Sequence, residues 1–126
     1  MRKAIKPLML ISAVSLFAAG CGGDSTSSDT IPADADVTVH ATGSITFDAK
    51  EYSATAGMVK FAYVNDSAIR HTLLVVKDGE KYGDLKLVIA KKGEVDSDSV
   101  SLDAGTYTLI CDVPGHTNMK AELTVK

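Results

Sequence analysis

The residues best suited to chemistry lie in one short stretch, Cys111-Asp-Val-Pro-Gly-His116-Thr-Asn-Met119. It contains a thiolate, an imidazole and a thioether, and it lies between two strand-like runs. A second imidazole, His71, begins a distant apolar run. Two imidazoles and a thiolate with a weak axial thioether suit copper, because thiolate favours Cu(I) while imidazole binds both oxidation states. The sequence therefore predicts one copper ion. Its candidate ligands are His71, Cys111, His116 and Met119.

Other chemistries fit this stretch less well. Two histidines and a cysteine can also hold zinc, but the neighbouring methionine favours copper. A Cys–His hydrolase needs a general base aimed at an exposed thiolate and an oxyanion hole, and no sequence feature marks a substrate cleft. A dinuclear copper centre needs a second cysteine in the loop, and residues 112–115 contain none. We therefore expect a protein that is not an enzyme.

The pattern Cys111-x-x-Pro-Gly-His116 also resembles the ligand loop of the cupredoxins, in particular the small single-domain bacterial members. The ending Met119-Lys-Ala-Glu-Leu-Thr-Val is similar to the family's Met-Lys-Gly-x-Leu-x-Val. This resemblance implies one type 1 (blue) copper ion and the transfer of single electrons. Only two residues separate His116 from Met119, where members with this loop usually have four. A backbone carbonyl in the axial position, or no axial ligand, is the alternative to Met119.

Two further residues are expected to tune such a site. The resemblance implies that the backbone N–H after the upstream histidine, here Thr72, donates to the cysteine sulfur. The Thr72 hydroxyl is also placed to bridge to the ligand loop. Pro114 has no backbone N–H and so removes one possible donor near the sulfur. Fewer donors leave a thiolate more electron-rich, which favours Cu(II).

The resemblance also implies a route for electrons and a kind of partner. Electrons would leave through the outer edge of His116, within a small apolar patch that includes Val113 and Pro114. A redox partner protein would dock there through a small, transient interface. The alternative function is a copper-binding module that buffers or delivers copper without electron transfer. It ranks lower because copper-handling proteins tend to carry Met- or His-rich tracts, and this chain has none.

Residues 1–20 are typical of a bacterial lipoprotein signal peptide. Three basic residues precede a mostly apolar stretch over residues 7–20, which is shorter than the roughly 20 residues that span a bilayer. The end of this stretch, Phe17-Ala-Ala-Gly-Cys21, resembles a lipobox, with Ala18 where the pattern prefers Leu. Cleavage would leave Cys21 as a lipid-bearing N-terminus, and ordinary secretion is the alternative. We therefore predict a protein outside the cytoplasm, anchored to a bacterial membrane by its lipid.

The segment 21–36 comprises Cys21 and a linker rich in Gly, Ser and Asp, which is expected to be flexible because it cannot bury enough apolar surface to become ordered. With Cys21 lipidated, Cys111 has no disulfide partner. A lone thiol in an oxidising compartment is explained by metal ligation. A buried, inert cysteine is the alternative.

Residues 37–126 form the predicted domain. About seven short β-type runs at turn spacings near 8–12 residues indicate an all-β, antiparallel sandwich, and the resemblance makes it a cupredoxin-like Greek key. The segment 82–92 fits either a strand or a short helix. Met58 is assigned to the core, His40 to the surface or an edge, and Asp112 to solvent.

The charge of the domain limits its partners. Residues 37–126 contain 10 basic and 12 acidic side chains and no basic cluster. Nucleic-acid binding is therefore not expected, because contacts to the phosphate backbone need concentrated Lys and Arg. We expect a monomer.

Overall fold

The computed structural model describes residues 30–126, which form eight strands and no helix. The strands are β1 (Val37–Ala41), β2 (Glu51–Ala54), β3 (Gly57–Asn65), β4 (His71–Lys77), β5 (Glu80–Ile89), β6 (Val95–Leu102), β7 (Gly105–Ile110) and β8 (Lys120–Val125). The all-β prediction is confirmed, with one strand more than the expected seven. The predicted signal peptide, Cys21 and most of the linker lie outside the described residues. Within the described part of the chain, no helix is long and apolar enough to cross a membrane.

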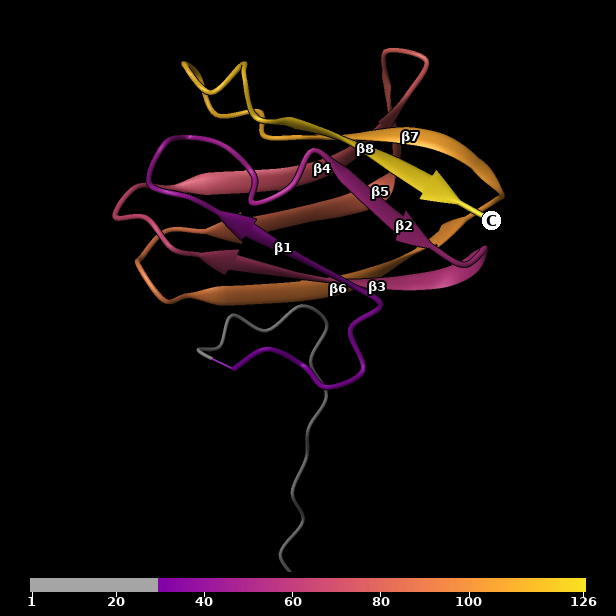
Figure 1. The fold of residues 1–126 in the computed structure, drawn as a ribbon, viewed down its shortest axis with the longest axis horizontal. Coiled ribbons are helices and arrows are strands. Elements are labelled where there is room, and N and C mark those ends of the chain that lie inside the picture. The colour runs from indigo at the N-terminus through magenta and orange to yellow at the C-terminus, as the bar shows by residue number, and fades with distance from the viewer. Residues whose placement is uncertain (1–29) are drawn as a thin grey trace, which may run out of the picture.

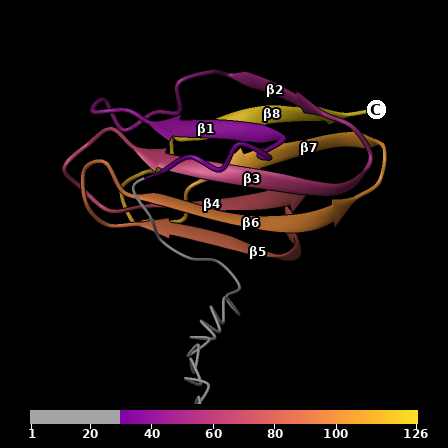
Figure 2. The same cartoon turned by 90° about the horizontal axis from the view of Figure 1, so that it is seen from below.

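The strands form two sheets packed face to face (Figures 1 and 2). One sheet has the order β1-β3-β6, and the other has the order β2-β8-β7-β4-β5. The pairs β3–β6, β4–β5, β4–β7 and β7–β8 are antiparallel, as expected for such a sandwich, but β1 pairs parallel with β3, and β2 pairs parallel with β8. Both sheets are therefore mixed. Each parallel pair joins strands that are separated along the chain, so the local alternation of side chains carries no sign of it.

Strand β5 settles the ambiguity over residues 82–92 in favour of a strand. Leu85, Leu87 and Ile89 are buried, while Lys86 between them is exposed. This period of two is the pattern of a strand with one face on the core, and the helix alternative is wrong. The core assignment of Met58 is also wrong. Its side chain is 70% exposed, because Met58 lies on the face of β3 opposite to the core residues Val59, Phe61 and Tyr63.

The interior between the sheets is filled mainly by aromatic and branched aliphatic side chains. Phe61 and Tyr63 from β3 meet Tyr107 and Leu109 from β7 in one buried cluster. Burying a side chain of this size stabilises the fold by about 1.5–3 kcal/mol. The Tyr107 hydroxyl donates to the Asp103 carbonyl at 2.8 Å. That bond fixes the turn into β7, the strand that leads to Cys111.

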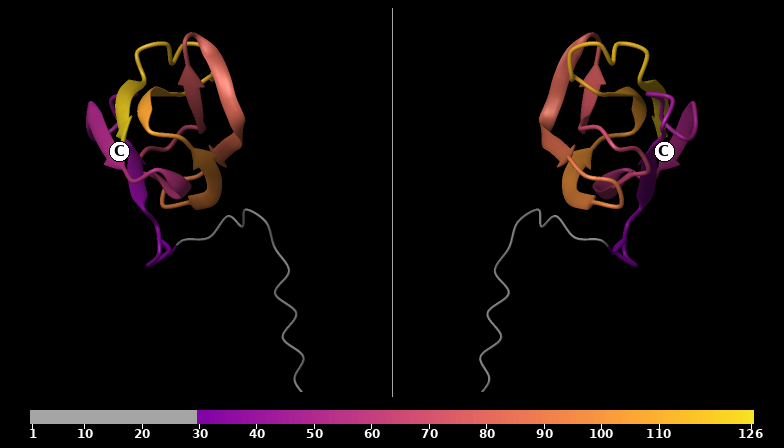
Figure 3. Two further views of the ribbon diagram at one scale, coloured as in Figure 1. Left: turned by 90° about the vertical axis from the view of Figure 1, so that its right-hand side faces the viewer. Right: turned by 90° about the vertical axis from the view of Figure 1, so that its left-hand side faces the viewer.

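The strand directions gather the longer loops at one end of the sandwich, visible on the left in Figure 1 and facing the viewer in the right panel of Figure 3. Strands β1, β3, β5 and β7 end there, while β2, β4, β6 and β8 begin there. The loops at this end are residues 42–50, 66–70, 90–94 and 111–119. The opposite end has short turns at residues 55–56, 78–79 and 103–104. The candidate ligands all lie at the end with the longer loops.

Candidate metal centre

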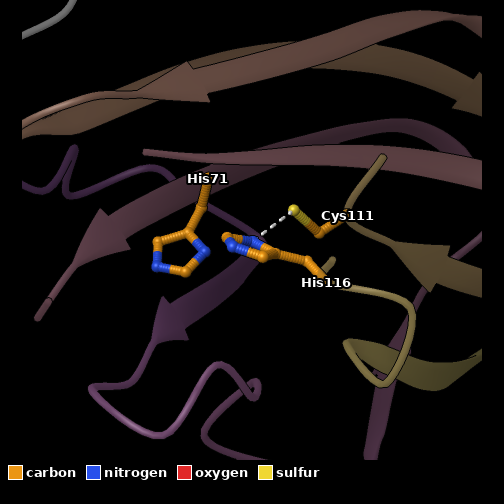
Figure 4. Close-up of side chains that lie close together, drawn as sticks. All are labelled: His71, Cys111 and His116. Atoms are coloured by element: carbon orange, nitrogen blue, oxygen red, sulfur yellow. Dashed lines mark hydrogen bonds between the residues drawn. The ribbon is translucent and has the colours of Figure 1, made fainter. Parts of the chain in front are cut away.

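Three predicted ligands, His71, Cys111 and His116, come together in the interior at this end (Figure 4). His71 is the first residue of β4, Cys111 directly follows β7, and His116 lies in the loop between β7 and β8. Their possible ligand atoms all lie within 4.8 Å of one another, and all three residues are buried. Among the described residues, this is the one cluster of three such groups. Side chains 40 residues apart in sequence thus share one site.

Hydrogen bonds within the loop fold it around the site. His116 N–H donates to the Val113 carbonyl at 3.0 Å, and Met119 N–H donates to the His116 carbonyl at 3.0 Å. Cys111 N–H donates to the Met119 carbonyl at 3.3 Å, which closes the loop. Gly115 has φ 88°, a conformation that favours glycine. The two consecutive tight turns therefore place His116 and Met119 on the buried side of the loop.

Met119 and Pro114, the other two predicted residues of this loop, lie on its buried and its exposed side, respectively. The Met119 side chain is buried, with 1% of its surface exposed, and its backbone is bonded to both Cys111 and His116. Pro114 lies on the exposed side of the loop. Met119 is thus positioned from the same loop as two of the clustered ligands. Together His71, Cys111, His116 and Met119 are arranged as a type 1 copper site.

The hydrogen bonds around His71 define which of its nitrogens is free. Ser67 Oγ donates to Asn65 Oδ1 at 2.9 Å, so its hydrogen is committed to that amide. Ser67 Oγ therefore accepts from His71 Nε2–H, which lies 2.7 Å away. His71 Nδ1 keeps its lone pair and is buried without a hydrogen-bond partner. The tautomer that the network assigns leaves a ligand atom directed at the cluster.

The unpartnered Nδ1 atom is what a metal site requires. A buried polar group left unsatisfied costs about 1–3 kcal/mol, and metal coordination would remove that cost. Cys111 Sγ and His116 Nδ1 are 3.6 Å apart. Bonds of about 2.0–2.3 Å from a tetrahedral metal to nitrogen and sulfur place such atoms roughly 3.5 Å from each other. The Cys111–His116 pair therefore already has the spacing that a bound ion of this size requires, and the buried His71 Nδ1 atom beside it fits as a third ligand.

Burial and charge keep His71 in the form that binds metal. The pKa of His71 is lowered, first by burial and then by the neighbouring His116. A histidine with a lowered pKa is a neutral imidazole at neutral pH, and only a neutral nitrogen has the lone pair for a metal. The site is thus prepared for a cation before one arrives.

Thr72 connects the sulfur to the rest of β4. Its N–H lies 3.4 Å from Cys111 Sγ and its hydroxyl oxygen 3.5 Å from the same atom. The hydroxyl also accepts from Asp112 N–H at 2.9 Å, which is the bridge to the ligand loop that the sequence led us to expect. Thr72 is itself buried.

Assigning Asp112 to solvent was an incomplete prediction. Its carboxylate is exposed, but Oδ1 accepts from the Thr72 hydroxyl at 2.6 Å and Oδ2 from Lys86 Nζ at 3.2 Å. These contacts lower the pKa of Asp112, the Thr72 hydroxyl most and Lys86 after it. Because Asp112 and Thr72 are distant in sequence, their contact follows only from the pairing of β4 with β7.

Some residues around the metal site were not predicted from the sequence, and one histidine was correctly predicted to lie outside the site. Ser67 and Asn65 carry no metal-binding signal in the sequence, yet they orient His71. His40 lies outside the cluster, with Nδ1 2.8 Å from Asp66 Oδ2. Tyr63 is buried, and its hydroxyl has no hydrogen-bond partner. Its pKa is raised by burial and, to a smaller extent, by the nearby Cys111.

Comparison with known proteins agrees with this geometry. A sequence profile described as copper binding proteins of the plastocyanin/azurin family matches residues 33–126. No curated protein sequence matches the chain significantly.

Solved structures with the same fold include auracyanins and amicyanin. Auracyanin A from Chloroflexus aurantiacus, described as a "blue" copper protein, has 26% identity and a TM-score of 0.61, over 71% of this chain and 96% of that one. Reduced auracyanin from Roseiflexus castenholzii has 20% identity and a TM-score of 0.62, over 71% of this chain and 95% of that one. Amicyanin from Paracoccus versutus has 22% identity and a TM-score of 0.56, over 82% of this chain and 100% of that one. At these identities the last two show the fold alone.

Proposed function

Because the chain belongs to the plastocyanin/azurin family of copper-binding proteins, we propose that it carries single electrons between partner proteins outside the cytoplasm and is not an enzyme. The observation that carries this proposal is the buried cluster of His71, Cys111 and His116 with an unpartnered Nδ1 atom. Copper bound there supplies one-electron chemistry between Cu(I) and Cu(II). Met119 is the proposed weak axial ligand.

The chain's own residues keep this site rigid and dry. Cys111 is held by the end of β7 and by the Thr72 N–H, and His71 by Ser67. His116 is held by the turn that closes on Val113. All three side chains are less than 10% exposed. A fixed, dry ligand set changes little when the charge at its centre changes by one unit, and this favours fast electron transfer.

We place the docking surface for the partner around the edge of His116. His116 is 7% exposed, so little of it reaches the surface, and its outer edge is the proposed exit for electrons. Pro114 on the same loop is exposed, and Val113 is half-buried. Ile69, on the adjoining loop 66–70, is 42% exposed. We propose that these apolar residues, all in loops at the same end of the sandwich, provide a small docking surface of the kind that suits a weak, transient redox encounter.

Reversible cycling is the property that tests this function. Protein film voltammetry of the copper-loaded protein should give a one-electron wave that survives repeated cycles. Electron self-exchange, followed by NMR line broadening in mixed oxidation states, should slow markedly in Pro114→Glu while the wave stays in place. A protein that binds copper but cannot be cycled would support copper buffering or delivery instead.

We also propose attachment to the membrane through Cys21. The support is the resemblance of Phe17 to Cys21 to a lipobox after an apolar stretch. In a bacterial host, the protein should partition with the membrane fraction and should incorporate labelled fatty acid. Cys21→Ser should abolish both. Labelling that persists in Cys21→Ser would contradict the proposal.

A further inference from the structure

The Thr72 hydroxyl has two possible acceptors and only one hydrogen. Its oxygen lies 3.5 Å from Cys111 Sγ and 2.6 Å from Asp112 Oδ1. A threonine hydroxyl donates once, and an ionised carboxylate can only accept. The short contact to Asp112 is therefore O–H···O⁻, within the range of strong charge-assisted hydrogen bonds, which lie near 2.5–2.7 Å. The hydrogen points at Asp112 and away from the sulfur.

Two further contacts hold the carboxylate in this position. Asp112 N–H donates to the same Thr72 oxygen at 2.9 Å, so two hydrogen bonds join Asp112 to the Thr72 hydroxyl. Lys86 Nζ, from the neighbouring strand β5, lies 3.2 Å from Asp112 Oδ2. Thr72 itself is only 3% exposed, so water does not compete freely for its hydroxyl. The direction of the hydroxyl is thus fixed by protein groups.

The number of hydrogen bonds to a copper-bound cysteine sulfur affects the stability of the two oxidation states. Each donor withdraws electron density from the thiolate and so favours Cu(I). Here Cys111 Sγ has the Thr72 N–H as one donor at 3.4 Å. A second donor, the hydroxyl, is close enough to reach it but is held by Asp112.

We propose that Asp112 is a positioning residue, which keeps the Thr72 hydroxyl off Cys111 Sγ and thereby stabilises Cu(II) over Cu(I). The inference rests on the proposed function, since it assumes that Cys111 binds copper. It concerns Thr72 and Asp112 in this chain, and it makes a carboxylate at the protein surface a control of the buried sulfur.

A set of four variants separates this role from the charge of Asp112. All are made in full-length protein carrying Cys21→Ser, so that Cys111 is the one thiol, and all are loaded with copper. Asp112→Ala removes both the charge and the acceptor, which frees the hydroxyl for the sulfur. Asp112→Asn removes the charge but keeps an acceptor for the hydroxyl. Thr72→Val, alone and combined with Asp112→Ala, removes the hydroxyl itself.

The measurements are the reduction potential and the energy of the thiolate-to-copper absorption band. We expect Asp112→Ala to shift the equilibrium towards Cu(I) by about tenfold, which corresponds to about 59 mV for one electron, and to move the band to higher energy. Asp112→Asn should shift both less. Thr72→Val alone should have little effect, because the sulfur does not use the hydroxyl in the native protein. In the Thr72→Val background, Asp112→Ala should lose most of its effect.

Each other outcome overturns the inference in a recognisable way. Equal shifts in Asp112→Ala and Asp112→Asn, undiminished by Thr72→Val, would show that Asp112 acts through its charge alone. A large shift in Thr72→Val alone would show that the hydroxyl already bonds the sulfur. If the parent protein has no thiolate-to-copper band, the proposed function fails, and this inference fails with it. If the parent protein has the thiolate-to-copper band but the variants change neither the band energy nor the reduction potential, the inference about Asp112 is overturned and the proposed function stands.

Discussion

The two ends of the sandwich are built from the same eight strands, but they differ in how those strands are joined. At the end with the longer loops, which carries His71, Cys111 and His116 and is called the copper end below, the loops are held by side-chain hydrogen bonds, such as those of Ser67 and Asp112. At the opposite end, β4 and β5 meet in the two-residue turn Asp78-Gly79, with φ values of 52° and 82°. Positive φ at both positions is the signature of the type I′ hairpin turn, in which Asp-Gly is favoured.

This difference assigns different tasks to the two ends. Long loops on a rigid scaffold place functional groups, whereas tight turns fix the register of the strands. At the opposite end, Tyr107 packs edge-on against Tyr82 and lies beneath Lys77, whose Nζ is 4.6 Å from the ring centroid. Changes at the copper end should therefore alter metal binding with little loss of stability. Changes at the opposite end should do the reverse.

The largest expected effect is loss of a ligand at the copper end. His71→Ala should weaken copper binding by about 1,000-fold, or about 4 kcal/mol, since even loss of a group that orients a ligand costs roughly 10–100-fold. The measurement is competition for Cu(I) with a coloured chelator. His40→Ala is the matched control, because His40 lies at the same end but outside the cluster. Equal weakening in both variants would show that the cluster is not the copper site.

Next in size is a change of backbone and packing in β5. Gly83 has φ 71°, and a Cβ atom there would lie 2.6 Å from Val100 Cγ2. Gly83→Ala should lower the free energy of unfolding by about 3 kcal/mol, from backbone strain and overpacking together. It should leave the copper spectrum unchanged.

The matched variant for Gly83→Ala is Gly93→Ala at the copper end. Gly93 has φ 86°, but a Cβ atom there meets nothing within 4 Å. Backbone strain alone should cost about 1 kcal/mol. Urea unfolding measures both variants, and equal losses would show that contact with Val100 does not matter.

A smaller effect distinguishes the two buried tyrosine hydroxyls. Tyr107→Phe removes the hydrogen bond to the Asp103 carbonyl and should cost about 1 kcal/mol of stability. Tyr63→Phe removes a buried hydroxyl that has no partner, so it should leave stability unchanged or raise it by about 1 kcal/mol. Thermal unfolding of the copper-free proteins gives both values. A destabilised Tyr63→Phe variant would mean that this hydroxyl has a partner in solution.

The smallest effect is a pH dependence of the copper-free protein. The pKa of His71 is lowered in the folded state by burial and by His116, so the unfolded chain takes up the proton first, near its ordinary pKa of about 6.5. Stability is therefore complete above that pH and falls as the pH decreases towards the lowered folded pKa. Urea unfolding at several pH values should show a shallower decline in His71→Gln than in the parent. Identical declines would contradict a neutral, buried His71.

Much of the site could be predicted from residue types and spacing alone. Cys111, His116 and Met119 lie in one loop, so their proximity follows from the chain, and His71 could be added because it begins an apolar run upstream of that loop. The roles of Ser67 and Asp112 could not be predicted. Each depends on hydrogen bonds to partners that the folded loops and strand pairing define, and a serine or aspartate in a loop otherwise suggests solvent exposure.

The fold shows the same division between local and distant information. Turn residues and short β-type runs predicted the all-β sandwich, because both are local properties of the sequence. The parallel pairing of β1 with β3 and of β2 with β8 joins distant segments, and parallel and antiparallel strands with one buried face alternate alike. Met58 was misassigned for a related reason: its apolar side chain suggests the core, but it lies on the face of β3 opposite to Val59 and Phe61, and which face the second sheet covers depends on distant segments.

His71, Cys111 and His116 are expected to hold copper through the cysteine thiolate. The direct measurement is a titration of the purified protein, with Cys21→Ser, by Cu(II), recorded by visible absorption. We expect an intense thiolate-to-copper band that saturates at one equivalent, is bleached by ascorbate and is absent in Cys111→Ser. Copper binding without that band, or a band that persists in Cys111→Ser, would contradict it.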